Sequence, residues 1–166
     1  KTLDIVATQA GYFGIDRIEA QKRAEYYLKR LDLWEKRNSP SRSLSGGMKR
    51  RLMIARSLVN HPKLLILDEP TASMDGDLEL KVMKTLFKEA DPYSLVILST
   101  HKLALLNFVN RIIVMDKGKI MLDGPRNEVI EKLKQSSMQA QQHAKKTQAE
   151  ASTKAGPEAA EPSSSV

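Results

Sequence analysis

The chain has 166 residues, of which 41% are hydrophobic, and it contains no cysteine. Its length and composition suit one globular domain with a substantial core, and the lack of cysteine excludes disulfides and thiol chemistry. No run of about 18 apolar residues occurs, which excludes a membrane-spanning helix within the sequence. The net charge of +7 lies entirely within residues 1–60, and such a basic region is compatible with nucleic acid, anionic lipid or nucleotide phosphate as a partner.

Residues 1–60 are predicted to be mostly helical. A helix begins at Asp16, because Asp16 followed three residues later by Glu19 is a capping-box pattern. Its apolar residues follow a helical stripe rather than an alternating pattern; they are Ile18, Ala24, Tyr27, Leu28, Leu31 and Leu33. The Asn-Ser-Pro sequence at residues 38–40 interrupts the pattern. A second helix is predicted over residues 46–60, with Ser45 as its N-cap.

From residue 61 onward, short strands alternate with helices. Two apolar runs, residues 64–67 and 94–100, predict strands that are buried on both faces. The turn at residues 116–118, Asp-Lys-Gly, predicts a β-hairpin. Further helices are predicted over residues 77–90, 102–110 and 126–134. This order indicates an α/β fold whose sheet is mostly parallel and is flanked by helices, with an antiparallel appendage.

Two adjacent carboxylates, Asp68 and Glu69, follow the first predicted strand. They lie at the carboxyl end of that strand, the edge at which open α/β sheets bind ligands. One carboxylate of such a pair can hold Mg²⁺, and the other can orient and polarise an attacking water. Taken alone, the Asp-Glu-Pro tripeptide is better explained as a strand that runs into solvent with two charges.

A turn at Ser45, Gly46 and Gly47 leads into the second helix, and its two glycines carry no side chains. Backbone N–H groups at such a helix start can approach a phosphate closely, and the basic residues 49–51 add positive charge beside it. The alternative is a flexible loop before an ordinary basic helix, which is the better explanation of this turn by itself.

Two more polar residues stand at positions where a ligand can bind. His101 follows the second predicted strand at the same sheet edge as Asp68, and its imidazole can donate to a phosphate oxygen. Asp75 ends a tight loop six residues after Glu69. Singly, they are better explained as a solvated histidine and a helix N-cap.

Together, these features resemble the second half of an ATP-binding-cassette ATPase. The sequence LSGGM resembles the signature loop of that family, and LLILDEP resembles the Walker B strand with its catalytic glutamate. ASMD resembles the D-loop, and STH resembles the H-loop. The resemblance covers residues 1–135 and implies a partial P-loop NTPase fold. Residues 1–60 would form the helical subdomain with the signature helix, and residues 61–135 the α/β core.

The resemblance also implies roles for individual residues. Asp68 would help to hold Mg²⁺, Glu69 would position the hydrolytic water, and His101 would contact the γ-phosphate of ATP. The Ser-Gly-Gly turn would bind the ATP held by a second copy in a head-to-tail homodimer. The residues expected to contact nucleotide are Ser45, Gly46, Gly47, Met48 and Asp75.

The exporters of the family are the most similar group. LSGGMKRR, with Met48 in place of the usual Gln, resembles exporters of drugs and polysaccharides, whereas the segment after Asp75 is more similar to the ATPase of type I secretion exporters. The resemblance therefore implies an ATP-hydrolysing exporter subunit that binds transmembrane permease subunits or domains. Its expected location is the cytoplasmic face of the cell (inner) membrane, peripherally.

One family motif is missing, because the sequence contains no G-x-x-x-x-G-K-[ST] and no Q-loop in a suitable context. The sequence thus looks truncated on its N-terminal side, and we expect weak or no ATP binding and no useful turnover by this chain alone. From residue 136 the composition changes to Gln, Ala, Ser, Lys, Glu and Pro, which predicts a disordered tail.

Two other classes of function stay open on the sequence alone. A soluble ATPase of the same superfamily that acts on nucleic acid or ribosomes would suit the basic residues 1–60. However, aromatic residues make up only 5% of the chain, and long coiled-coil heptads and a duplicated cassette are absent. Base stacking is therefore sparse, and no specific nucleic acid is expected as a partner. The other class is a non-enzymatic fragment that acts through protein contacts.

Overall fold

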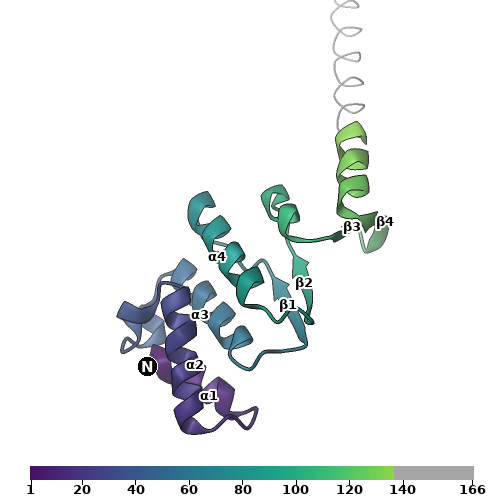
Figure 1. Cartoon of the computed structure of the whole chain (residues 1–166). Helices are drawn as coiled ribbons and strands as arrows, with labels where there is room; N and C mark the ends of the chain where they lie inside the picture. The colour runs from purple at the N-terminus through teal and green to yellow at the C-terminus, as the bar shows by residue number, and fades with distance from the viewer. Residues whose placement is uncertain (137–166) are drawn as a thin grey trace, which may run out of the picture. The chain divides into compact units, whose positions relative to one another are not determined.

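The computed structural model describes residues 1–136, which form two compact units, residues 1–108 and residues from 109 onward (Figure 1). The expected disordered tail begins at residue 136, which is still helical, and its residues 137–166 lie outside the described part of the chain. Within residues 1–136, no helix is both long enough and apolar enough to cross a membrane.

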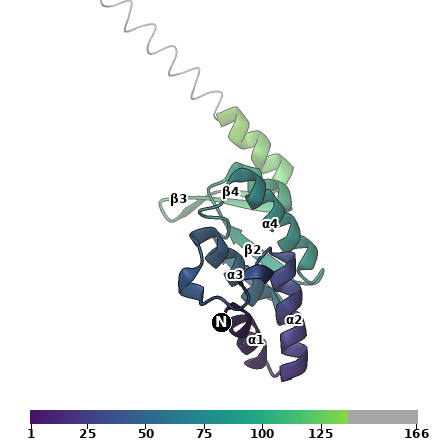
Figure 2. The ribbon, with the colours of Figure 1, turned by 90° about the vertical axis from the view of Figure 1, so that its left-hand side faces the viewer.

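Three α-helices pack together in the first unit, as predicted for the first part of the chain (Figure 2). They are α1 (Thr2–Gly11), α2 (Arg17–Arg30) and α3 (Gly46–Leu58), and the 3-10 turns η1 (Trp34–Lys36) and η2 (Ser41–Ser43) connect α2 to α3. The predicted apolar stripe of α2 is buried, with one exception. Ile18 is 69% exposed, because it lies in the first turn of α2, next to an α1–α2 turn that is itself exposed.

The start of α2 is capped as its sequence pattern predicts. The Asp16 side chain accepts hydrogen bonds from the backbone N–H groups of Ile18 and Glu19, at 3.0 and 3.1 Å. The Glu19 side chain does not complete the reciprocal capping box; its carboxylate pairs with Arg23 at 2.7 Å instead. An (i, i+4) pair on the helix surface thus replaces the second bond of the box.

Two parallel strands follow, β1 (Leu64–Asp68) and β2 (Leu95–Ser99), paired in register so that Asp68 lies opposite Ser99. The predicted crossover helix between them is α4 (Gly76–Glu89). The helix predicted over residues 102–110 is instead a 3-10 segment, η3 (Leu103–Phe108). The first unit is therefore mixed α/β with a parallel sheet, in agreement with the predicted fold class.

The prediction that both faces of these strands are buried is wrong. Leu65 and Leu67 on β1 pack into the core with the helices, whereas Leu64 and Ile66 are 51% and 66% exposed. On β2 the cross-strand partners of the exposed pair, Leu95 and Ile97, are exposed as well. The helices described in this unit cover one face of the sheet, so alternate side chains of each apolar run remain in contact with solvent.

The second unit contains the predicted hairpin, formed by β3 (Arg111–Asp116) and β4 (Lys119–Pro125). Its turn residues Lys117 and Gly118 both have positive φ, 47° and 76°, as two-residue hairpin turns of type I′ require. Residues 126–136 are helical, two residues beyond the predicted helix end.

Candidate functional site

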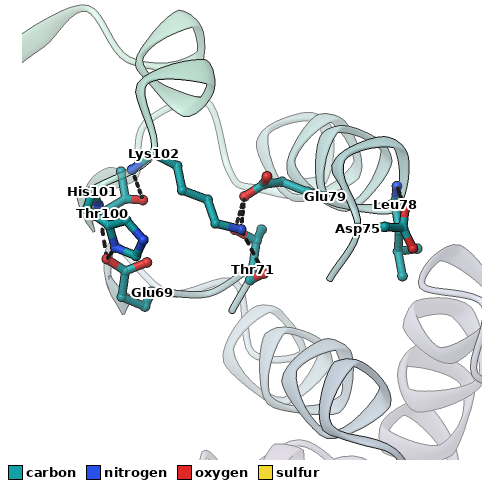
Figure 3. Close-up of polar contacts among 8 residues, drawn as sticks. All are labelled: Glu69, Thr71, Asp75, Leu78, Glu79, Thr100, His101 and Lys102. Atoms are coloured by element: carbon teal, nitrogen blue, oxygen red, sulfur yellow. Dashed lines mark hydrogen bonds and ion pairs between the residues drawn. The ribbon is translucent and has the colours of Figure 1, made fainter. Parts of the chain in front are cut away.

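Glu69 and His101 are in contact at the carboxyl end of the parallel sheet (Figure 3). His101 Nδ1 lies 2.7 Å from Glu69 Oε1, and the backbone N–H of His101 donates to the same oxygen at 3.0 Å. The backbone N–H of Glu69 in turn donates to the carbonyl of Ser99 at 3.0 Å. Because β1 and β2 are parallel and in register, the residues that follow them meet at one edge of the sheet.

The other carboxylate oxygen of Glu69 is buried and has no hydrogen-bond partner. Ionised carboxylates normally satisfy both oxygens, so a buried oxygen without a partner marks a place for a polar ligand such as water. The backbone of Glu69 also has φ of 44°, the left-handed region that non-glycine residues enter at a cost and mainly at functional sites. The His101 side chain beside it is 80% exposed and can therefore contact a ligand from solvent.

Asp68, the last residue of β1, is exposed beside Glu69. Within residues 1–136, no cluster of three or more His, Asp or Glu side chains can hold a metal ion. Mg²⁺ is commonly held by one or two carboxylates together with water and substrate phosphates. Asp68 thus fits a Mg²⁺ ion that arrives with a nucleotide, but it does not make a metal site by itself.

The Ser-Gly-Gly turn contacts a part of the chain that sequence reasoning did not connect with it. Ser45 caps α3, and its Oγ accepts from the N–H of Met48 at 3.3 Å. A Cβ atom on Gly47 would lie 3.2 Å from the carbonyl oxygen of Ser73, and one on Gly46 would lie 3.4 Å from Ser73 Cβ. Gly47 therefore also allows close packing against the loop that precedes α4, a requirement invisible in the sequence.

Asp75 is the N-cap of α4, and its side chain accepts a hydrogen bond from the backbone N–H of Leu78 at 2.9 Å. This is the simpler of the two interpretations that the sequence allows for Asp75. The side chain is exposed, and it directly follows the loop that touches the glycine turn. Within residues 1–136, no hydrogen bond or ion pair joins the turn at residues 45–48 to Glu69 or His101.

The three basic residues after the glycines do not act together. Arg51 is buried, and its guanidinium donates to the carbonyls of Leu31 and Asp32, at 2.9 and 3.3 Å. These carbonyls lie at the end of α2, where a cation also interacts favourably with the helix dipole. Lys49 and Arg50 are exposed. Arg51 thus joins two helices, and of the three basic residues only Lys49 and Arg50 are exposed.

A buried polar cluster lies next to the Glu69–His101 pair, and sequence reasoning missed it. Lys102 Nζ lies 2.9 Å from Glu79 Oε1 and donates to the carbonyl of Thr71 at 3.3 Å, and the Thr71 hydroxyl donates to the same Glu79 oxygen (Figure 3). Burial by itself raises the pKa of Glu79, but the hydrogen bonds from Thr71 and Lys102 outweigh burial and hold that pKa below its ordinary value. In the sequence these residues are isolated polar positions on three elements, so nothing indicates that they meet.

The sequence of this chain is similar to a known protein family and to several curated proteins. The family model described as ABC transporter matches residues 2–72. A putative ABC transporter ATP-binding protein of Pyrococcus horikoshii is 38% identical over 131 residues, which are 78% of this chain and 46% of that protein. A putative hemin import ATP-binding protein of Staphylococcus epidermidis is 36% identical, over 72% of this chain and 54% of its own length. A macrolide export ATP-binding/permease protein of Yersinia pestis is also 36% identical, over 78% of this chain and 19% of its own length.

Among solved structures, a dimeric ATP-binding cassette in a post-hydrolysis state bound to ADP and Pi matches with a TM-score of 0.69 and 29% identity. The match covers 76% of this chain and 56% of that one. The chain thus spans about half the length of the Pyrococcus relative and of this cassette.

Proposed function

Because the chain belongs to the ATP-binding domains of the ABC transporter family and spans part of such a domain, we propose that it supplies the water-positioning half of an ATPase that drives transport. The observation that carries this proposal is the Glu69–His101 contact, which leaves one Glu69 oxygen buried without a partner. That oxygen is suited to accept a hydrogen bond from a water and to orient it for in-line attack on a phosphate.

Bound Mg²⁺ and ATP would supply the phosphoryl group and neutralise its charge, with Asp68 as the carboxylate that holds the metal. The ionised Glu69 carboxylate can only accept hydrogen bonds, so the proton between the two residues belongs to His101 Nδ1. In the neutral ring, Nε2 then carries a lone pair; it becomes a donor only when the ring is protonated. The exposed ring edge of His101 is the part that would contact a phosphate oxygen.

The glycine turn has a separate role in this proposal. Ser45, Gly46 and Gly47 open α3 with free backbone N–H groups, the usual arrangement for binding phosphate at a helix start. Among residues 1–136, the turn makes no polar contact with Glu69 or His101, which suits a role toward the nucleotide of a second copy. A head-to-tail dimer would place it there, with Met48 and Asp75 at the same interface, and the dimeric form of the ADP-bound cassette supports such an assembly.

The direction of transport is the most specific part of the proposal. The curated relatives include proteins named for hemin import and for macrolide export. We favour export, because the sequence around Met48 resembles that of exporter ATPases. The partners would be transmembrane permease subunits or domains, as in the Yersinia pestis relative, whose name joins ATP-binding and permease parts. The chain would then act peripherally at the cytoplasmic face of the membrane.

The test is a hybrid cassette in which this chain is joined to the part of the Pyrococcus horikoshii relative that it does not cover. We expect the hybrid to hydrolyse Mg-ATP, and we expect Glu69→Gln to abolish turnover while ATP binding and nucleotide-dependent dimerisation persist. The matched control is Glu35→Gln, the same change at an exposed glutamate. A hybrid without hydrolysis, or one that hydrolyses equally well with Glu69→Gln, would contradict the proposal.

A further inference from the structure

We propose that Lys102 is a positioning residue that holds His101 against Glu69 through its ion pair with the buried carboxylate of Glu79. The ammonium of Lys102 is bonded to Glu79 and to the Thr71 carbonyl, so its effect is exerted through its neighbour in the chain. The inference rests on the proposed function, because it assigns Lys102 the role of positioning His101 at the same site.

The contacts of Lys102 connect three separate segments (Figure 3). Its ammonium bonds to Glu79 in the first turn of α4 and to the carbonyl of Thr71 in the loop after β1. Its backbone N–H donates to Thr100 Oγ1 at 3.1 Å, which fixes the turn after β2. Lys102 is thus fixed at both its backbone and its side chain, and His101 is the residue directly before it.

The same cluster also holds the segment that carries Glu69, the residue that contacts His101. Thr71 is two residues beyond Glu69, is fully buried, and gives its hydroxyl hydrogen bond to the Glu79 oxygen that Lys102 binds. The Glu79 carboxylate is therefore the common acceptor for the segment that carries Glu69 and the segment that carries His101. Movement of either segment breaks a bond to Glu79, so the two catalytic side chains are held at a fixed separation.

The carboxylates of Glu79 and Glu89 on α4 are both at most 9% exposed in their ion pairs. Glu79 is 6% exposed, whereas the Lys81–Asp32 pair on the same helix has both side chains about half exposed or more. Exposed pairs contribute little to stability, but removing one partner of a buried pair leaves an uncompensated charge in the interior. Loss of the Lys102 ammonium therefore forces the Glu79 carboxylate to take up a proton or the loop after β2 to move.

The experiment separates positioning from simple charge compensation with four variants of the whole chain. Lys102→Met removes the ammonium, and Lys102→Arg retains a cation. The double variant Glu79→Met with Lys102→Met removes both charges, so no buried charge is left unpaired. Lys84→Met is the matched control, since Lys84 is an exposed lysine on α4. Urea denaturation shows which variants are folded.

Two NMR measurements report the His101–Glu69 contact in each variant. The ring nitrogen shifts show whether Nδ1 carries the proton at a pH where the ring is neutral, and amide hydrogen exchange shows whether the His101 N–H is still bonded to Glu69. His61 serves as the internal reference. We expect wild type, Lys84→Met and Lys102→Arg to keep Nδ1 protonated. In Lys102→Met and in the double variant we expect a mixture of tautomers and His101 exchange about tenfold faster.

Unchanged His101 shifts and exchange in a folded Lys102→Met chain would overturn the inference, as would recovery of both in the double variant. The double variant keeps the test decisive if Lys102→Met fails to fold, because it contains no unpaired buried charge. These readouts do not depend on ATP hydrolysis. A hybrid cassette that is indifferent to Glu69→Gln would therefore refute the proposed function without altering the NMR result, and the two failures are distinguishable.

Discussion

The carbonyl oxygen of Ser73 lies 3.2 Å from the point that a Cβ atom on Gly47 would occupy. This close approach joins the start of α3 to the loop that leads into α4, and it gives Gly47 a packing role inside its own chain. Ser73 has φ of 65°, so the loop already adopts a conformation that is costly for a non-glycine residue. Neither side of the contact can move away without strain.

Replacement of Gly47 by Ala should therefore destabilise the chain. The added methyl group meets a backbone atom rather than a flexible side chain, so we expect a loss of about 1 kcal/mol despite the better helix propensity of Ala. Gly46→Ala is the matched control, because its methyl group would make only ordinary contacts with the Ser73 side chain. Urea denaturation of both variants measures the difference, and equal midpoints would refute the packing role of Gly47.

Arg51 should be essential for joining α2 to α3. Arg51→Met keeps the apolar stem but removes the hydrogen bonds to the carbonyls of Leu31 and Asp32, and we expect a cost of about 2 kcal/mol. Arg50→Met, at the neighbouring exposed position, should change the free energy of unfolding by less than about 0.5 kcal/mol. Thermal or urea unfolding distinguishes the two; an equal effect of both would mean that Arg51 contributes only surface charge.

Acid should weaken the cluster around Glu79. The pKa of Glu79 is lower in the folded chain than its ordinary value of 4.5, so the folded state binds the proton less readily than the unfolded state does. The resulting stabilisation is complete above about pH 4.5 and is lost as pH falls through the lower folded pKa. Glu79→Gln should reduce the decline in unfolding free energy below pH 4.5. An identical decline in wild type and variant would contradict the lowered pKa.

The exposed face of the β1–β2 sheet should promote association of the chain with itself and with apolar dyes. Four aliphatic side chains are exposed there, those of Leu64, Ile66, Leu95 and Ile97, and contiguous apolar surface of this kind favours aggregation. Ile66→Thr combined with Ile97→Thr should lower dye fluorescence and the apparent mass in solution while changing the unfolding free energy little. Leu65→Thr on the covered face should instead destabilise the fold by about 2 kcal/mol or more.

The amino-acid sequence is enough to predict the order of elements, the α/β class and the edge of the sheet at which the polar residues gather. These follow from local rules: helical stripes, N-caps such as Asp16 and Ser45, the Lys-Gly turn, and the side on which parallel strands end. The family resemblance carried by the LSGGM and LLILDEP motifs agrees with the relatives found by comparison.

Tertiary packing sets which distant residues are in contact, and the sequence did not predict these contacts. It brings Gly47 against Ser73, turns Arg51 toward the end of α2, and assembles Thr71, Glu79 and Lys102 from three elements. It also leaves one face of an apolar strand pair exposed, where the continuous apolar runs predicted burial on both faces. The physical reason is that local patterns fix backbone conformation over a few residues, whereas burial and pairing depend on which distant segments are available to cover a given side chain.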